Sequence, residues 1–200
     1  MATKGEETRE RLLAMAETLI LEKGYAGMSL DQLLKETDLT KGAFFHHFKG
    51  KAALARGVLE RYASNDMALF TEWSARAERL SDDPLERVLI FLRLFEEFLD
   101  GLGKPFPGCI FASFTYESRQ FGPDITEYIR KSLDAWVALY IKKLEPLIER
   151  HGPDQEGVTA HGLAEMITTI IEGGFVMANA YNDATWVQRQ VMEYRRYLTL

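Results

Sequence analysis

A stretch of basic and aromatic side chains without any carboxylate runs from Leu39 to Leu59. The nearest acidic residues, Asp38 and Glu60, lie just outside it. Because DNA phosphates repel carboxylates, such a stretch is typical of a surface that binds a polyanion. On charge alone, a basic face exposed to solvent explains it equally well. The basic and histidine positions are Lys41, His46, His47, Lys49, Lys51 and Arg56.

Two short helices are expected to carry this stretch. Ser29 and Gln32 have the spacing of a capping box, which predicts a helix that starts after Ser29 and ends near Thr37-Asp38. Thr40 can cap a second short helix a few residues later. Together with a bracing helix over residues 8–23, they predict a helix-turn-helix.

The second short helix has two different faces. At 100° per residue, Phe44 and Phe48 lie one turn apart on its inner face. The outer face combines a glycine that permits close approach, an aromatic ring that can pack on a thymine methyl, and donors for phosphate or guanine. These are the properties of a helix that reads the major groove. The outer positions are Gly42, Phe45, His46 and Lys49.

The sequence from Thr8 to Leu54 resembles the DNA-binding domain of the TetR family of transcriptional regulators. The link Gly24-Tyr25, the Ser29 cap, and the trailing Phe48 and Lys51 all match at the family's spacing. The resemblance implies contacts to base edges from Lys41, Gly42 and Phe45, and contacts to phosphates from Ser29, His46, His47 and Lys51. The full set of expected DNA-binding residues is Ser29, Thr40, Lys41, Gly42, Ala43, Phe45, His46, His47, Lys49 and Lys51.

Two of these positions carry alternatives. Phe45 stands where the family most often has tyrosine, so it keeps a surface for a thymine methyl but cannot donate a hydroxyl hydrogen bond to phosphate. His47 falls near the inner face of its helix, where a structural histidine is the other interpretation. Operator choice is therefore expected to differ from that of typical family members.

The rest of the chain is expected to be helical as well. Apolar residues recur at helical spacing almost throughout, and glycine and proline breakers divide the 200 residues into about nine helices. The first 60 residues hold nine basic and nine acidic groups, so the net charge of −6 lies wholly in the remainder. We expect an all-α protein with a three-helix DNA-binding domain over residues 1–50 and a larger helical ligand-binding and dimerisation domain over residues 51–200.

Aromatic side chains are concentrated in one part of the second domain. Seven of the twelve phenylalanines lie between residues 91 and 121. Rings at helical spacing usually form core, but the family resemblance implies a small-molecule cavity in this region. Ser113, Glu117 and Glu172 are candidates to orient the ligand. The expected ligand-binding residues are Phe91, Phe95, Cys109, Phe111, Phe114, Tyr116, Trp136, Tyr140 and Phe175.

Cysteine content and the terminal segments indicate where and how the protein acts. The single cysteine, Cys109, cannot form an intramolecular disulfide, and no signal peptide or membrane span is evident, so we expect a cytoplasmic protein. Cys109 is either a redox or electrophile sensor or a small buried residue at a turn. Small residues in the helix expected over residues 158–181 favour close helix pairing, and the family resemblance implies a homodimer. Those small residues are Gly173, Gly174, Ala178 and Ala180.

These features favour a ligand-responsive transcriptional regulator, most simply a repressor that a small molecule releases from a double-stranded DNA operator. One alternative is regulation through the Cys109 thiol, and another is a helical ligand-binding dimer with no DNA role. An enzyme is not expected, because no nucleophile with a base, paired carboxylates or metal ligands occur at a recognisable spacing. No cofactor is expected either.

Overall fold

The computed structural model describes residues 3–101, 108–152 and 157–199. These residues form nine α-helices and one short 3-10 helix, with no strand among them. The prediction of an all-α chain of about nine helices is therefore confirmed. Two of the glycine and proline breakers lie at residues 101–108 and 152–157, and residues 102–107 and 153–156 of these segments lie outside the described ranges.

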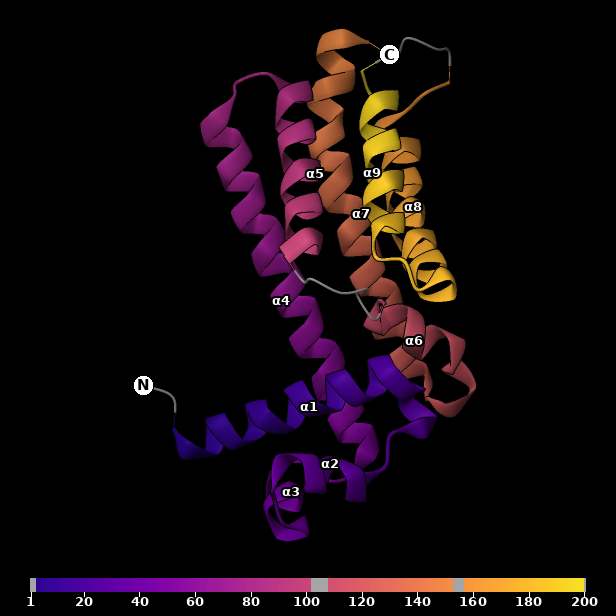
Figure 1. Ribbon diagram of the computed structural model, residues 1–200. Helices are drawn as coiled ribbons and strands as arrows, with labels where there is room; N and C mark the ends of the chain where they lie inside the picture. The colour runs from indigo at the N-terminus through magenta and orange to yellow at the C-terminus, as the bar shows by residue number, and fades with distance from the viewer. Residues whose placement is uncertain (1–2, 102–107, 153–156, 200) are drawn as a thin grey trace. The chain divides into compact units, whose positions relative to one another are not determined.

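Three helices open the chain (Figure 1): α1 (Lys4–Gly27), α2 (Leu30–Thr37) and α3 (Lys41–His47). A capping box of Thr3 and Glu6 starts α1, so this helix begins before the residue 8 expected from the sequence. The backbone of α1 is non-helical at Gly24, where φ is +74°. Glycine adopts this conformation without the steric cost of a Cβ atom, and the chain turns there toward α2.

Longer helices follow. Pro84 and Pro123 open two of them at a position where a missing N–H costs nothing, and Thr159 caps the helix after residue 159. The helix after Thr159 confirms the one expected over residues 158–181. The elements are α4 (Lys51–Leu80), α5 (Pro84–Gly101), α6 (Ile110–Tyr116), η1 (Ser118–Gln120), α7 (Pro123–His151), α8 (Ala160–Tyr181) and α9 (Thr185–Tyr197).

The chain divides into two compact units. The first comprises Met1–Asp66 with Cys109–Arg130, and the second comprises Met67–Gly108 with Lys131–Leu200. The first unit therefore contains α6, which a boundary at residue 50 does not anticipate. The reason is aromatic packing: the ring of Tyr25 lies 5.6 Å from that of Phe114 and 4.6 Å from that of Phe121.

Each unit has its own core. In the first, Leu12, Phe44 and Phe111 are fully buried. In the second, Phe91 packs its ring edge against Phe70 and Tyr140. Within the second unit α8 and α9 lie side by side (Figure 1). No helix in the described ranges is long and apolar enough to span a bilayer.

Candidate functional site

The two short helices are fixed at their N-termini by side-chain caps. The Ser29 hydroxyl accepts a hydrogen bond from the backbone N–H of Gln32 at 3.1 Å, and the Thr40 hydroxyl accepts one from Ala43 at 3.2 Å. Asp38, with φ of 51°, ends α2 in the left-handed conformation. Both predicted caps are confirmed. They define the geometry of α2 and α3, whose termini would otherwise leave N–H groups unsatisfied.

The two faces of α3 are separated as predicted. Phe44 and Phe48 are buried, whereas 55% of Phe45 is exposed, with its ring packed edge-on against that of Phe44 at 5.2 Å. An exposed phenylalanine held by a buried neighbour is a rigid apolar contact surface. The exposed positions around it are Lys41, Gly42, His46 and Lys49, while Ala43 and His47 are half-buried.

One carboxylate reaches this surface from the neighbouring helix. The ammonium of Lys41 lies 3.2 Å from the carboxylate of Asp31 on α2, and both side chains are largely exposed. Exposed ion pairs contribute little free energy, so a phosphate or a base edge can replace Asp31 at low cost. Asp31 lies outside the acid-free stretch, and no signal in that stretch indicated the contact.

Lys51 differs from its expected role as a phosphate contact. Its ammonium donates to the backbone carbonyl of Tyr25 at 2.6 Å and lies 4.3 Å above the centre of the Tyr25 ring. Burial lowers the pKa of Lys51, and the nearby Glu117 carboxylate opposes that shift. In this structure Lys51 therefore secures the link between α1 and α2.

Glu117 completes the same link. Its two carboxylate oxygens accept hydrogen bonds from the backbone N–H groups of Tyr25 at 2.7 Å and Ala26 at 2.8 Å. A Cβ atom on Gly24 would collide with this carboxylate. The sequence suggested that Glu117 could orient a ligand. The structure instead places it against backbone N–H groups that α1 leaves unsatisfied.

An ion-pair cluster braces α1 against α4. The Arg61 guanidinium lies 2.5 Å from the carboxylates of both Glu10 and Glu17. Burial raises the pKa of Glu17, and the Arg61 charge opposes that shift. This cluster joins residues more than 40 positions apart and has no local signature in the sequence.

The structure distributes the nine expected ligand-binding residues over both units. Cys109, Phe111 and Phe114 are buried in the first unit, where Phe111 packs against Tyr62 at 5.4 Å between ring centres. Tyr116 is 75% exposed. The remaining five are buried in the second unit: Phe91, Phe95, Trp136, Tyr140 and Phe175. Their role in ligand binding stays a prediction.

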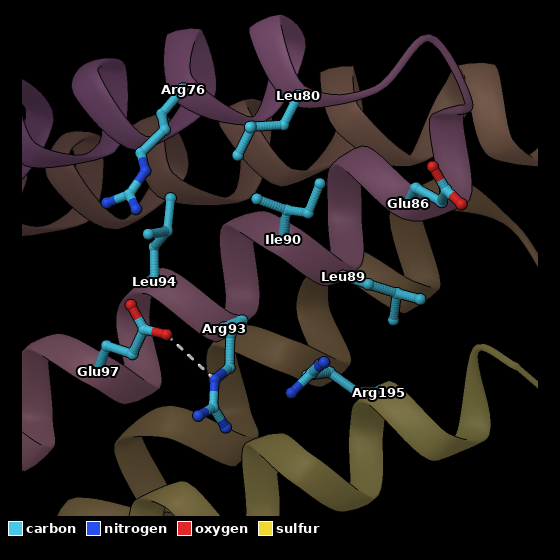
Figure 2. Close-up of a pocket in the computed structure, with 9 residues that line it drawn as sticks. All are labelled: Arg76, Leu80, Glu86, Leu89, Ile90, Arg93, Leu94, Glu97 and Arg195. Atoms are coloured by element: carbon cyan, nitrogen blue, oxygen red, sulfur yellow. Dashed lines mark hydrogen bonds and ion pairs between the residues drawn. The ribbon is translucent and has the colours of Figure 1, made fainter.

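Two cavities in the second unit are lined by other residues. The first, of about 420 Å³, has an apolar floor and a charged rim formed by α4, α5 and α9 (Figure 2). Figure 2 shows Arg76 and Arg195 on its opposite sides, with the Arg93 guanidinium bonded to Glu97. The second, of about 430 Å³, lies among α4, α5 and α7. None of the nine expected residues lines either described cavity.

Family models match both parts of the chain. Residues 12–58 match the model described as bacterial regulatory proteins, tetR family, and residues 84–191 match the C-terminal domain of LmrA/YxaF-like transcriptional regulators. The second match alone covers more than half of the chain. The chain belongs to the TetR family. It is therefore a transcriptional regulator and not an enzyme.

Individual relatives of this TetR-family protein agree with that assignment. The HTH-type transcriptional repressor NemR of Escherichia coli K12 is 30% identical over 147 residues, which cover 72% of this chain and 71% of NemR. YxaF of Bacillus subtilis is 27% identical over 92% of this chain and 91% of its own length. A TetR-family regulator from Agrobacterium tumefaciens has the same fold, with a TM-score of 0.81 at 21% identity over 97% of this chain and 98% of its own.

Proposed function

We propose that this TetR-family protein is a homodimeric repressor that binds a double-stranded DNA operator through the exposed face of α3 and is released by a small-molecule ligand. The observation that carries the proposal is the exposure of Phe45 beside Lys41 and Gly42 on a helix whose other aromatic face is buried. An α-helix such as α3, about 10–12 Å across with its side chains, fits into a major groove about 12 Å wide.

The roles on α3 follow from chemistry and position. Lys41 and Phe45 are proposed to contact base edges, the lysine by donating to guanine and the ring by packing on a thymine methyl. Gly42 lets the helix approach the bases closely. Lys49 and His46 are proposed to contact phosphates on the flanks of the groove. The caps at Ser29 and Thr40 fix the backbone at the starts of α2 and α3. Ala43 and His47 are proposed to lie on the same surface, near those phosphates.

A second copy of the chain is the proposed partner along α8. The faces of this helix differ: Gly174 packs against the α9 backbone, with its ideal Cβ position 3.1 Å from the Cα of Val187, whereas Gly173 has open space around it. An apolar and small-residue stripe at helical spacing is not buried within the chain. Its members are Met166, Ile170, Gly173, Met177 and Ala180.

Pairing through this stripe would give the regulator two reading helices. In helix-turn-helix dimers, two such helices bind half-sites about 34 Å apart on a partly palindromic operator. In a second conformation, the two reading helices would have a spacing that does not match the half-sites. A ligand that binds this conformation more tightly would lower operator affinity, by no more than its difference in binding free energy between the two conformations. Repression is also what the name of NemR states for that relative.

The thiol-sensor alternative receives no support from the position of Cys109. Only 2% of this residue is exposed, and oxidants or electrophiles react with accessible thiolates.

A gel-shift assay with duplex fragments of the source genome tests the main proposal. We expect a specific complex that weakens as the salt concentration rises and that nonspecific competitor DNA does not displace. If no fragment forms such a complex at moderate salt, the proposal is wrong.

A further inference from the structure

The cavity among α4, α5 and α7 contains a cation in a largely apolar setting. Ala77, Val88 and Leu139 supply apolar lining, and Ser74 and Lys143 supply polar groups. A volume of about 430 Å³ is within the usual range for small-molecule sites. All of these residues belong to the second unit, so the cavity is formed within one compact body.

The Lys143 ammonium has few partners in this cavity. It donates to the Ser74 hydroxyl at 2.5 Å and lies 4.3 Å from the centre of the Phe91 ring. No carboxylate in the described part of the chain lies within ion-pair distance of it, and Glu78 acts on it only at longer range. Burial lowers the pKa of Lys143 to about 8. A half-buried charge whose one hydrogen-bond acceptor is a hydroxyl favours binding of a counterion.

The cations of the cavity in Figure 2 lie in a different setting. There, Arg93 is paired with Glu97 at 3.2 Å, and Arg195 is paired with the buried Glu96 at 3.1 Å, although the Arg195 Nε has no hydrogen-bond partner in the described part of the chain. Arg76, the third cation of that cavity, is exposed to solvent. The Lys143 ammonium is half-buried and has no carboxylate of the described residues within ion-pair distance, so the second cavity is the better candidate for an anionic ligand.

The other charged groups around Lys143 add to the positive potential. Arg87 on α5 and Lys142 on α7 also line the cavity, whereas Glu78 on α4 is its single acidic lining residue. Arg87 is paired with Asp82 at 3.2 Å, so Lys142 and Lys143 against Glu78 leave one formal positive charge in excess.

We propose that this cavity binds an acidic small molecule whose carboxylate pairs with Lys143 and whose apolar body packs against Ala77, Val88 and Leu139. Binding itself does not depend on DNA. Only its consequence for the operator depends on the function proposed above, since that function requires a ligand without naming its class.

Isothermal titration calorimetry of the full chain without DNA tests the proposal. The probes are octanoate and 4-phenylbutyrate, each compared with its neutral primary amide. At pH 7 we expect each acid to bind about tenfold or more tightly than its amide, as is typical of a charge-assisted hydrogen bond. K143M keeps an unbranched side chain of similar length without the charge and should abolish the difference. K131M, at an exposed position on the same helix, should retain it.

The pH dependence provides a second readout. Between neutral pH and about pH 8 the affinity for octanoate should be constant, and it should fall above that as Lys143 loses its proton. The other charged groups that face the cavity are Glu78, Arg87 and Lys142. K143M should show no such fall. Equal binding of acid and amide by the unmodified chain, or acid binding by K143M at full strength, would overturn the proposal.

A gel shift with the same acids separates this inference from the proposed function. If an acid binds through Lys143 but leaves operator affinity unchanged, the cavity assignment stands and release by that ligand is wrong. If neither acid binds but a neutral compound releases the protein from DNA, the regulator proposal stands and the acidic-ligand assignment is wrong.

Discussion

Glu117 accepts a hydrogen bond from the backbone N–H of Tyr25 at 2.7 Å, across 92 positions of sequence. A second bond, to the N–H of Ala26, and the Lys51 ammonium on the Tyr25 carbonyl complete a charged latch around the end of α1. The latch holds the link that leads into α2. Within the first unit, the segment after α6 therefore restrains the chain that leads into the helix-turn-helix.

Replacing Glu117 by glutamine should weaken this latch. One side of the amide is a donor that cannot accept from an N–H, so we expect a loss of about 1–3 kcal/mol in the free energy of unfolding. Chemical denaturation of the variant measures it. Glu145→Gln, on the exposed side of α7, is the matched control and should unfold with the unmodified chain. Equal stability of both variants would show that the latch contributes nothing.

Gly24→Ala tests the same region by steric means. The backbone φ of +74° is unfavourable for alanine, and the added Cβ would collide with the Glu117 carboxylate. We expect a destabilisation of about 1–3 kcal/mol, visible as a lower Tm. Gly101→Ala introduces a Cβ into open space at the end of α5, so this variant should be as stable as the unmodified protein or more so. An unchanged Tm for the Gly24→Ala variant would contradict the positive φ of Gly24 and its close approach to the Glu117 carboxylate.

Phe45→Ala separates DNA recognition from folding. Because Phe45 is 55% exposed, its removal should leave Tm nearly unchanged. Operator affinity, measured by fluorescence anisotropy, should fall about tenfold or more, since burial of a phenylalanine contributes about 1.5–3 kcal/mol. Leu80→Ala, which removes a side chain that is 62% exposed on α4, should bind the operator normally. If the Phe45→Ala variant binds the operator with full affinity, Phe45 does not contribute to the DNA interface.

The α8 stripe can be tested by sedimentation velocity. Met177→Glu places a charge at the proposed centre of pairing, where burial without a partner is unfavourable. We expect the unmodified chain to sediment as a dimer and this variant as a folded monomer. Leu80→Glu, on α4, should remain dimeric. A monomeric unmodified chain, or an undisturbed dimer of the Met177 variant, contradicts pairing through α8.

Lys143 should make stability depend on pH. Its pKa is about 8 in the folded chain and 10.5 as an ordinary value, so the unfolded chain binds more protons between these pH values. The free energy of unfolding should therefore rise through this window relative to that of Lys143→Met. Below pH 8 the methionine variant should be the more stable of the two by a constant margin. A margin that does not shrink between pH 8 and 10.5 would contradict the described burial.

Local signals in the sequence predicted the first unit well. The caps at Ser29 and Thr40 and the division between Phe44 and Phe45 depend on residues within one or two turns, where helix geometry is decisive. The family resemblance implied a phosphate contact for Lys51, whereas its bond to the Tyr25 carbonyl depends on how distant segments fold together. The hydrogen bonds of Glu117 to the backbone N–H groups of Tyr25 and Ala26 likewise join segments more than 90 positions apart and leave no local signal.

The second unit was predicted in outline only. The periodic apolar pattern indicated long helices, but a ring at helical spacing looks the same whether it fills a core or lines a cavity. Phe91 packs in the core, and the ligand site we propose depends instead on Lys143, whose burial results from the packing of α4, α5 and α7. Lysine residues are usually exposed, so sequence alone favoured the opposite interpretation.

Selection of bound sequences from a random pool of duplex DNA tests the central claim most directly. The account predicts enrichment of two inverted half-sites about one helical turn apart, with base preferences that relax at defined positions for Lys41→Ala. Recovery of no enriched sequence, or of the same motif at the same affinity with both Lys41→Ala and Phe45→Ala, would contradict it.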